Sequence, residues 1–203
     1  MADETTMHNQ AAYDQIAGLY AARHTERDRS FPDLAAAFAA RLPSVADIAD
    51  LGCGPASDGA RFAQAGHRVT GVDRSAGMLA HAARVLPGRV IRADLRCLPV
   101  AGQSLDGVWC CAALLHVPHD QTMAALHEMR RVLRPDGCLA LVTAAGQGAR
   151  LERVPYAPDA QRWFFYREPA ELDEQVRGAR LQVVAVTEEI AHRHWLKILA
   201  SAA

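Results

Sequence analysis

Short apolar runs alternate with helical patterns from residue 44 to residue 145 of this chain. Strands that are buried on both faces read as continuous apolar runs, and strands that alternate with helices form right-handed βαβ units. The pattern therefore predicts an α/β fold with a mainly parallel sheet and helices on both faces. The expected strands are 44–51, 67–73, 89–94, 104–115 and 138–145, and the expected helices between them are 57–66, 75–86 and 119–134.

Two further helical patterns precede this alternation. Apolar residues recur at helical spacing over residues 8–24, where Asn9 is the expected N-cap. A charged connector, residues 25–30, leads to a proline that opens a second helix over residues 32–42. We expect residues 8–42 to form an N-terminal helical cap.

The alternation ends after residue 145. The last part of the chain predicts a loop at 146–161, an extended segment at 162–167, a helix at 169–179 and a closing hairpin of strands at 181–189 and 192–200. We expect residues 1–203 to form one domain, in which residues 145–168 lie on the substrate side.

The charge and cysteine content exclude several classes of partner. A formal net charge of −1 gives no electrostatic basis for binding nucleic acid or an anionic membrane. No apolar stretch approaches the roughly 20 residues of a membrane span, and no signal peptide is visible, so a cytoplasmic location is expected. The five cysteines lack metal-ligand spacing, which predicts reduced thiols and no metal site.

The stretch "ADLGCGPASDG" places a glycine turn between the first expected strand and its helix. Gly52 and Gly54 let a ligand approach the backbone at the carboxyl end of the sheet. A dinucleotide fingerprint requires a third glycine where this chain has Ser57, and Asp50 stands before the first glycine. The turn alone favours a nucleotide-like ligand without deciding its class.

Acidic residues also end the second and third expected strands. Asp73 is placed to accept both hydroxyls of a ribose in charge-assisted hydrogen bonds, and Asp94 to accept from an adenine amino group. Sites that bind nicotinamide cofactors contain the same ribose-binding carboxylate. The two carboxylates therefore predict a site for an adenosine. The ligand that carries this adenosine could be an adenosyl methyl donor or a nicotinamide cofactor.

Taken together, these segments resemble the class I S-adenosylmethionine-dependent methyltransferases, of the small bacterial methyltransferase type 11 kind. The resemblance runs from about residue 13 to residue 143. It implies a Rossmann-like seven-stranded sheet of order 3-2-1-4-5-7-6, with strand seven antiparallel. The segments that carry it are "YDQIAGLYAARH", "IADLGCGPASDG", "VTGVDRSAGMLAHAAR", "RADLRCLPVAGQSLDGVWCCAALLHVP" and "MRRVLRPDGCLAL".

The resemblance implies S-adenosyl-L-methionine as methyl donor and S-adenosyl-L-homocysteine as product. Gly52 and Gly54 would pass under the methionine part, Met78 would lie against the adenine, and Tyr13 and Tyr20 would reach over the donor. The implied cofactor-binding residues are Tyr13, Tyr20, Asp50, Gly52, Cys53, Gly54, Asp73, Arg74, Met78, Asp94, Leu95, Cys111 and Ala112.

His116 is the candidate catalytic residue. Methyl transfer from a sulfonium mainly requires alignment and desolvation, and a base is needed only if the acceptor arrives protonated. His116 follows the fourth expected strand, where an imidazole could take that proton. The alternative interpretation is structural, with His116 packing or capping the loop.

Residues after the fifth strand are candidates for contacting the acceptor. Aromatic side chains there could wall an apolar pocket, or instead pack as a core strand or flap: Trp163, Phe165 and Tyr166. Three arginines could meet an anionic acceptor, or instead be solvated loop charges: Arg153, Arg162 and Arg167.

A small-molecule acceptor, methylated on oxygen or nitrogen, is the expected substrate. The stretch "CCAALLH" lacks the motif of enzymes that methylate nucleobase amino groups. Two alternatives stay open: a non-catalytic adenosyl-cofactor-binding protein, and a nicotinamide-dependent oxidoreductase. The sequence leaves the oligomeric state open.

Overall fold

The computed structural model describes residues 2–24 and 31–202 and is built on a seven-stranded sheet. The strands of this sheet are β1 (Asp47–Leu51), β2 (Arg68–Asp73), β3 (Val90–Arg92), β4 (Leu105–Cys111), β5 (Leu133–Ala144), β8 (Leu181–Ile190) and β9 (His194–Ala202). Their spatial order is β3-β2-β1-β4-β5-β9-β8. When only the seven strands of this sheet are numbered along the chain, β8 is the sixth and β9 the seventh, and the order is 3-2-1-4-5-7-6.

The strand directions agree with the predicted fold class. β1, β2, β3, β4 and β5 pair in parallel, whereas β9 runs antiparallel to both of its neighbours. The register of β1 and β2 pairs Leu51 with Val72, so the residues that follow both strands lie at one edge of the sheet. The predicted α/β sheet, its strand order and the closing hairpin are confirmed.

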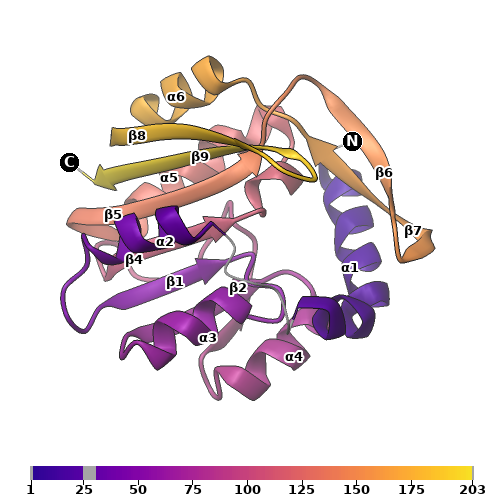
Figure 1. Cartoon of the computed structure of the whole chain (residues 1–203), viewed down its shortest axis with the longest axis horizontal. Helices are drawn as coiled ribbons and strands as arrows, with labels where there is room; N and C mark the ends of the chain where they lie inside the picture. The colour runs from indigo at the N-terminus through magenta and orange to yellow at the C-terminus, as the bar shows by residue number, and fades with distance from the viewer. Residues whose placement is uncertain (1, 25–30, 203) are drawn as a thin grey trace.

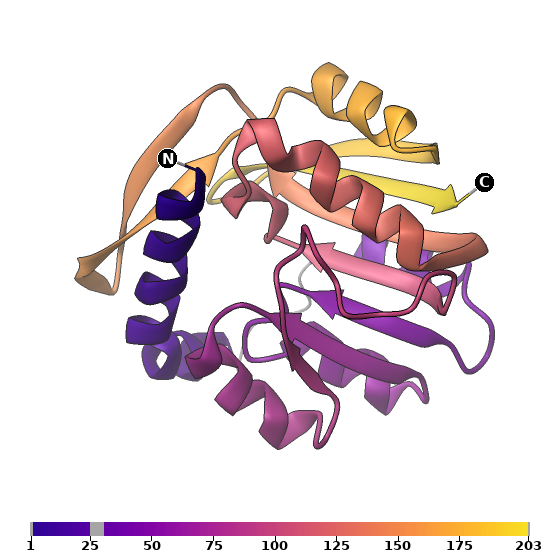
Figure 2. The same ribbon diagram turned by 180° about the vertical axis from the view of Figure 1, so that it is seen from behind.

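Helices cover both faces of the sheet. The helices are α1 (Ala2–His24), α2 (Pro32–Ala39), α3 (Ser57–Gln64), α4 (Ala76–Val85), α5 (Thr122–Val132) and α6 (Pro169–Gly178). One face packs against α2, α3 and α4 through Phe38, Phe62 and Leu79, and the other against α5 and α6 through Leu126 and Leu172. Figure 1 shows α2 and α3 in front of the sheet, and Figure 2 shows α5 and α6 from the opposite side. None of these described helices is long and apolar enough to cross a membrane.

An additional hairpin differs from the predicted loop at residues 146–161. Strands β6 (Ala149–Val154) and β7 (Ala157–Phe165) pair antiparallel in a separate two-stranded sheet. The loop prediction is wrong because β6 is mostly exposed and polar, so it lacks the apolar run of a buried strand. In both ribbon views the hairpin lies beside α1 (Figures 1 and 2), and α1 contacts β7.

The N-terminal region also differs from prediction. Asn9 lies inside α1, which begins at Ala2, so Asn9 is not its N-cap. α2 packs against β5 and β9, so α1 is the helix that lies at the carboxyl ends of the strands (Figure 1). The connector at residues 25–30, within the expected cap, lies outside the described residues.

The fourth strand ends earlier than predicted. β4 stops at Cys111, and the following Ala112 has a φ of 55°. This left-handed residue turns the chain into two short 3-10 helices, Leu114–His116 and His119–Gln121. The first of these helices, which ends at His116, contacts both β5 and β7.

Candidate functional site

The glycine turn follows β1 and is held against β2. The backbone N–H groups of Gly52 and Cys53 both donate to the Val72 carbonyl, at 2.7 and 3.0 Å. A Cβ on Gly52, whose φ is +65°, would lie 2.2 Å from the Cβ of Ala113, so no larger residue fits there. A Cβ on Gly54, with a φ of +54°, would meet only Tyr20 at 3.7 Å. Gly54 therefore leaves the backbone open toward α1.

Asp73 ties this turn to the start of α4. Its two carboxylate oxygens accept from the backbone N–H groups of Gly54 at 2.9 Å and of Ser75 at 2.8 Å. Burial raises the pKa of Asp73 above its ordinary value, although the backbone donors oppose that rise. A hydroxyl pair that donates to this carboxylate would stabilise its charged form.

Asp94 lies between two arginines. Its carboxylate accepts from Arg74 and, at 2.6 and 2.8 Å, from Arg96. Burial opposes ionisation, but the hydrogen bonds and charge of Arg96 outweigh it, and the pKa falls to about 2. Asp94 is therefore ionised at neutral pH and is held in one orientation.

A cavity joins these features between the strand ends and α1. Every implied cofactor-binding residue lines it except Asp50, which is buried beneath the turn and accepts from the N–H of Gly59 at 3.0 Å. Burial, followed by the nearby charge of Asp58, raises the pKa of Asp50 well above its ordinary value. The cavity is also lined by residues that sequence reasoning missed: Thr6, Asn9, Gln10 and Arg96.

The donor set of the cavity fits an adenosyl methyl donor. Two carboxylates stand at the ends of neighbouring strands, Asp73 and Asp94, next to a turn without side chains at Gly52 and Gly54. Met78 is buried and also lines the cavity. Within the described part of the chain, no group of three or more His, Cys, Asp or Glu side chains is placed to hold a metal ion.

His116 connects α1 to β7 across the cavity. Its Nδ1 lies 2.8 Å from the Trp163 carbonyl, which can only accept, so Nδ1 carries the ring proton. Its Nε2 then accepts from the Tyr13 hydroxyl at 2.7 Å. Burial lowers the pKa of His116 to about 3, so the ring is neutral near pH 7. Both nitrogens are occupied, which favours the structural interpretation of this histidine.

Asn9 forms a second connection between the same elements. Its Oδ1 accepts from the Trp163 N–H at 2.7 Å, and its Nδ2 donates to the Trp163 carbonyl at 2.9 Å. The side-chain amide thus binds both backbone groups of one strand residue, as a neighbouring strand would. One signal could have revealed this residue: Asn9, Tyr13 and Ile16 share one face of α1 at helical spacing.

Trp163 and Phe165 lie in β7 and Tyr166 directly follows it, and none of the three lines the cavity. Trp163 stacks on Phe165 at a centroid distance of 6.4 Å, and Phe165 also packs against His119. Tyr166 bonds Glu152 and Arg193 through its hydroxyl. These three side chains therefore contact one another or neighbouring side chains outside the cavity lining, and their role in acceptor binding stays a prediction.

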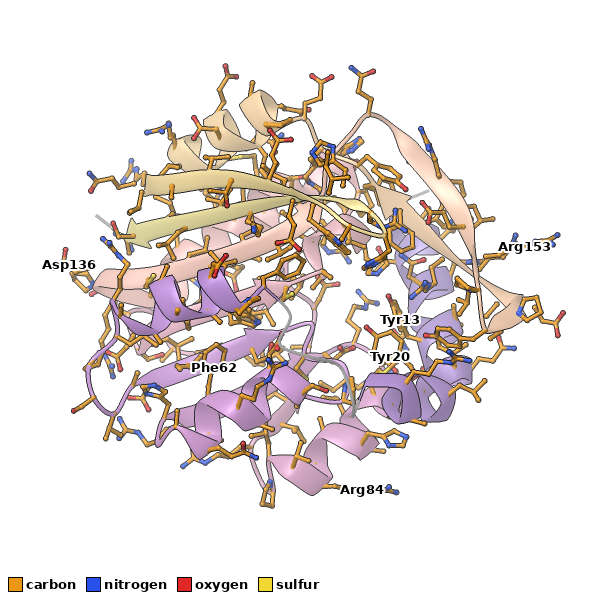
Figure 3. The ribbon with its side chains drawn as sticks, viewed as in Figure 1. Tyr13, Tyr20, Phe62, Arg84, Asp136 and Arg153 are labelled. Atoms are coloured by element: carbon orange, nitrogen blue, oxygen red, sulfur yellow. The ribbon has the colours of Figure 1, made fainter. Side chains whose placement is uncertain are left out.

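The three candidate arginines have three different environments. Arg153 is exposed and points away from the molecule (Figure 3). Arg167 is buried and donates to the carbonyls of Phe165 and Val117, both at 2.8 Å, and burial lowers its pKa to about 10. Arg162 is partly buried and contacts a residue of the cavity lining, because it donates to the Tyr13 hydroxyl at 3.1 Å.

Comparison with known proteins agrees with this geometry. A methyltransferase domain model matches residues 48–137. The malonyl-[acyl-carrier protein] O-methyltransferase of Enterobacter lignolyticus is 34% identical over 178 residues, which cover 84% of this chain and 67% of that protein. The trans-aconitate 2-methyltransferase of an Azoarcus species is 40% identical over 123 residues, which cover 57% of this chain and 45% of that protein.

A solved structure extends the similarity to most of the fold. The Burkholderia thailandensis 1,6-didemethyltoxoflavin-N1-methyltransferase, bound to 1,6-didemethyltoxoflavin and S-adenosylhomocysteine, superposes with a TM-score of 0.73 at 26% identity. The match covers 95% of this chain and 87% of that one. With the sheet order, the glycine turn and the acidic strand ends, these similarities show that the chain belongs to the class I S-adenosylmethionine-dependent methyltransferases.

Proposed function

We propose that this protein transfers a methyl group from S-adenosylmethionine to an oxygen or nitrogen of a small-molecule acceptor. The observation that carries the proposal is the cavity in which the glycine turn, Asp73 and Asp94 meet under α1. The names of the relatives include one O-methyltransferase and one N1-methyltransferase, so both acceptor atoms occur among similar proteins.

In this proposal each part of the cavity has one task. Asp73 accepts from the ribose hydroxyls, Asp94 accepts from the adenine amino group, and the backbone at Gly52 and Gly54 lies along the methionine part. Gly54 is open on the side that faces Tyr20, which supports this placement. The donor supplies an activated methyl group on sulfur, and the protein supplies alignment and exclusion of water.

His116 serves in this proposal as a positioning residue. Its contacts with Tyr13 and Trp163 hold α1 and the β6–β7 hairpin together above the cavity. Residues 1–203 would then act as one domain, in which α1 and the hairpin, and not α2, form the cover over the donor.

The test is a transfer assay with purified protein, S-adenosylmethionine and a panel of small acids, amines and phenols. With one acceptor of the panel, we expect more S-adenosylhomocysteine to form than without acceptor, and we expect the mass of that acceptor to increase by one methyl group. Tight binding of S-adenosylhomocysteine without transfer to any panel member would instead support a non-catalytic adenosyl-binding protein.

A further inference from the structure

Arg162 is a partly buried cation beside Tyr13, a residue of the cavity lining. It projects from β7 and donates to the Tyr13 hydroxyl, and its guanidinium lies 5.3 Å from the ring centres of both Tyr13 and Phe164. Tyr13 and His116 both line the cavity. The guanidinium is thus held by ring contacts next to the cavity wall.

The hydrogen-bonding capacity of Arg162 is largely unused. Among the described residues it forms no ion pair, and its buried Nε has no hydrogen-bond partner. Its neighbour Arg193 is different, because Glu152 accepts from it at 2.7 and 3.2 Å. Arg162 is only partly buried, and no described carboxylate forms an ion pair with it, so its guanidinium is suited to an anionic ligand.

The same region offers no imidazole that is free to act as a base. His116 is the only histidine lining the cavity in the described part of the chain, and both of its ring nitrogens are engaged. An alcohol or an ammonium acceptor would have to lose a proton there. A carboxylate reaches the site already deprotonated at neutral pH.

We propose that the acceptor is a carboxylic acid, which Arg162 binds through its carboxylate beside Tyr13, and that the product is a methyl ester. In this step one carboxylate oxygen forms a bond to the methyl carbon, and the carbon–sulfur bond breaks with its electron pair passing to sulfur. No proton is released, so the step needs no base. The inference rests on the proposed function, of which it specifies the acceptor class.

Acids and their primary amides test this inference, because each pair differs little except in charge. Binding of benzoate, hexanoate and glutarate to the protein loaded with S-adenosylhomocysteine is measured by calorimetry, beside benzamide, hexanamide and glutaramide. At least one acid should bind about tenfold or more tightly than its amide. Arg162→Met should remove this preference, and Arg162→Lys should restore part of it, while both variants keep the affinity for S-adenosylhomocysteine.

Arg153→Met is the matched control, because Arg153 belongs to the same hairpin but is exposed and points away from the cavity (Figure 3). It should keep the acid preference. Methyl groups transferred to an acid should be released as methanol in alkali, as expected of an ester. Equal binding of every acid and amide, an acid preference that survives Arg162→Met, or an alkali-stable methyl product would overturn the inference. Failure of the unmodified protein to bind S-adenosylhomocysteine would instead overturn the proposed function itself.

Discussion

Asp73 has two roles at the end of β2, since it holds the glycine turn and faces the cavity. Loss of two charge-assisted hydrogen bonds to a ribose, each about 1.5–3 kcal/mol, corresponds to at least a 100-fold loss of affinity at about 1.4 kcal/mol per tenfold. Asp73→Ala should therefore weaken binding of S-adenosylhomocysteine by about 100-fold or more, as measured by calorimetry.

Asp136→Asn is the control for this substitution. Asp136 is exposed at the end of the molecule opposite α1 (Figure 3), and asparagine tolerates its φ of 64°. Its affinity should match that of the unmodified protein. If Asp73→Ala changed the affinity by less than about threefold, Asp73 would not belong to the ribose site.

Gly52 tests the packing beneath the turn. Gly52→Ala combines a positive φ with a Cβ contact of 2.2 Å, whereas Gly88→Ala has a φ of +71° and nothing within 4 Å. Both changes cost about 1–2 kcal/mol in backbone strain, and crowding adds about 1–3 kcal/mol at Gly52 alone. Thermal unfolding should show the larger loss for Gly52→Ala, and equal losses would contradict the tight contact with Ala113.

The lowered pKa of His116 predicts that the free energy of unfolding depends on pH. In the folded state the pKa of His116 is about 3, below its ordinary value of 6.5. Between these two pH values the imidazole therefore binds a proton in the unfolded state but not in the folded state. Stability from this group is therefore complete above pH 6.5 and falls as the pH decreases, by up to about 1.4 kcal/mol per pH unit. His116→Asn, whose amide can still donate to Trp163, should lose less stability than the unmodified protein between pH 7 and pH 4.5.

The comparison uses denaturant unfolding at both pH values. His127→Asn, at an exposed position of α5, is the control and should follow the unmodified protein. An identical pH dependence for His116→Asn and the unmodified protein would show that His116 is not held neutral in the folded state.

At the scale of elements, α1 depends on β7 for its position. Asn9 supplies a pair of hydrogen bonds to Trp163, and a buried backbone donor left without its partner costs about 1–3 kcal/mol. Asn9→Ala should therefore raise hydrogen exchange throughout α1, by about tenfold, without changing exchange in β1 and β4. Gln15→Ala, on the exposed side of α1, is the control, and equal exchange in the two variants would contradict this contact.

The elements that could be predicted from sequence are those whose signals are local. Buried strands such as β1 and β4 are apolar runs, and the glycine turn and acidic strand ends directly follow such strands. The cover over the cavity could not be predicted in this way, because it joins residues distant in the chain. Asn9 and Trp163 are 154 positions apart, and β6 is too exposed to show an apolar pattern.

At the scale of the whole molecule, the sheet order explains why the site lies where it does. β1 and β4 are neighbours in space although β2 and β3 separate them in the chain, so the sheet changes direction between them. Ligands of open α/β sheets bind at such a point. The order brings the turn after β1, Asp73 at the end of β2 and Asp94 beyond β3 to one edge of the sheet. Helix α1 lies beyond this edge (Figure 1), and its Tyr13 and Tyr20 line the cavity.

Calorimetric titration with S-adenosylhomocysteine, with NADH titrated in parallel, tests most directly whether the cavity binds an adenosyl methyl donor. The two ligands share an adenosine, so Asp73 and Asp94 alone would not separate them, whereas the missing third glycine and the family similarity do. We expect micromolar binding of S-adenosylhomocysteine at one site per chain and no binding of NADH. Binding of NADH without binding of S-adenosylhomocysteine would contradict it.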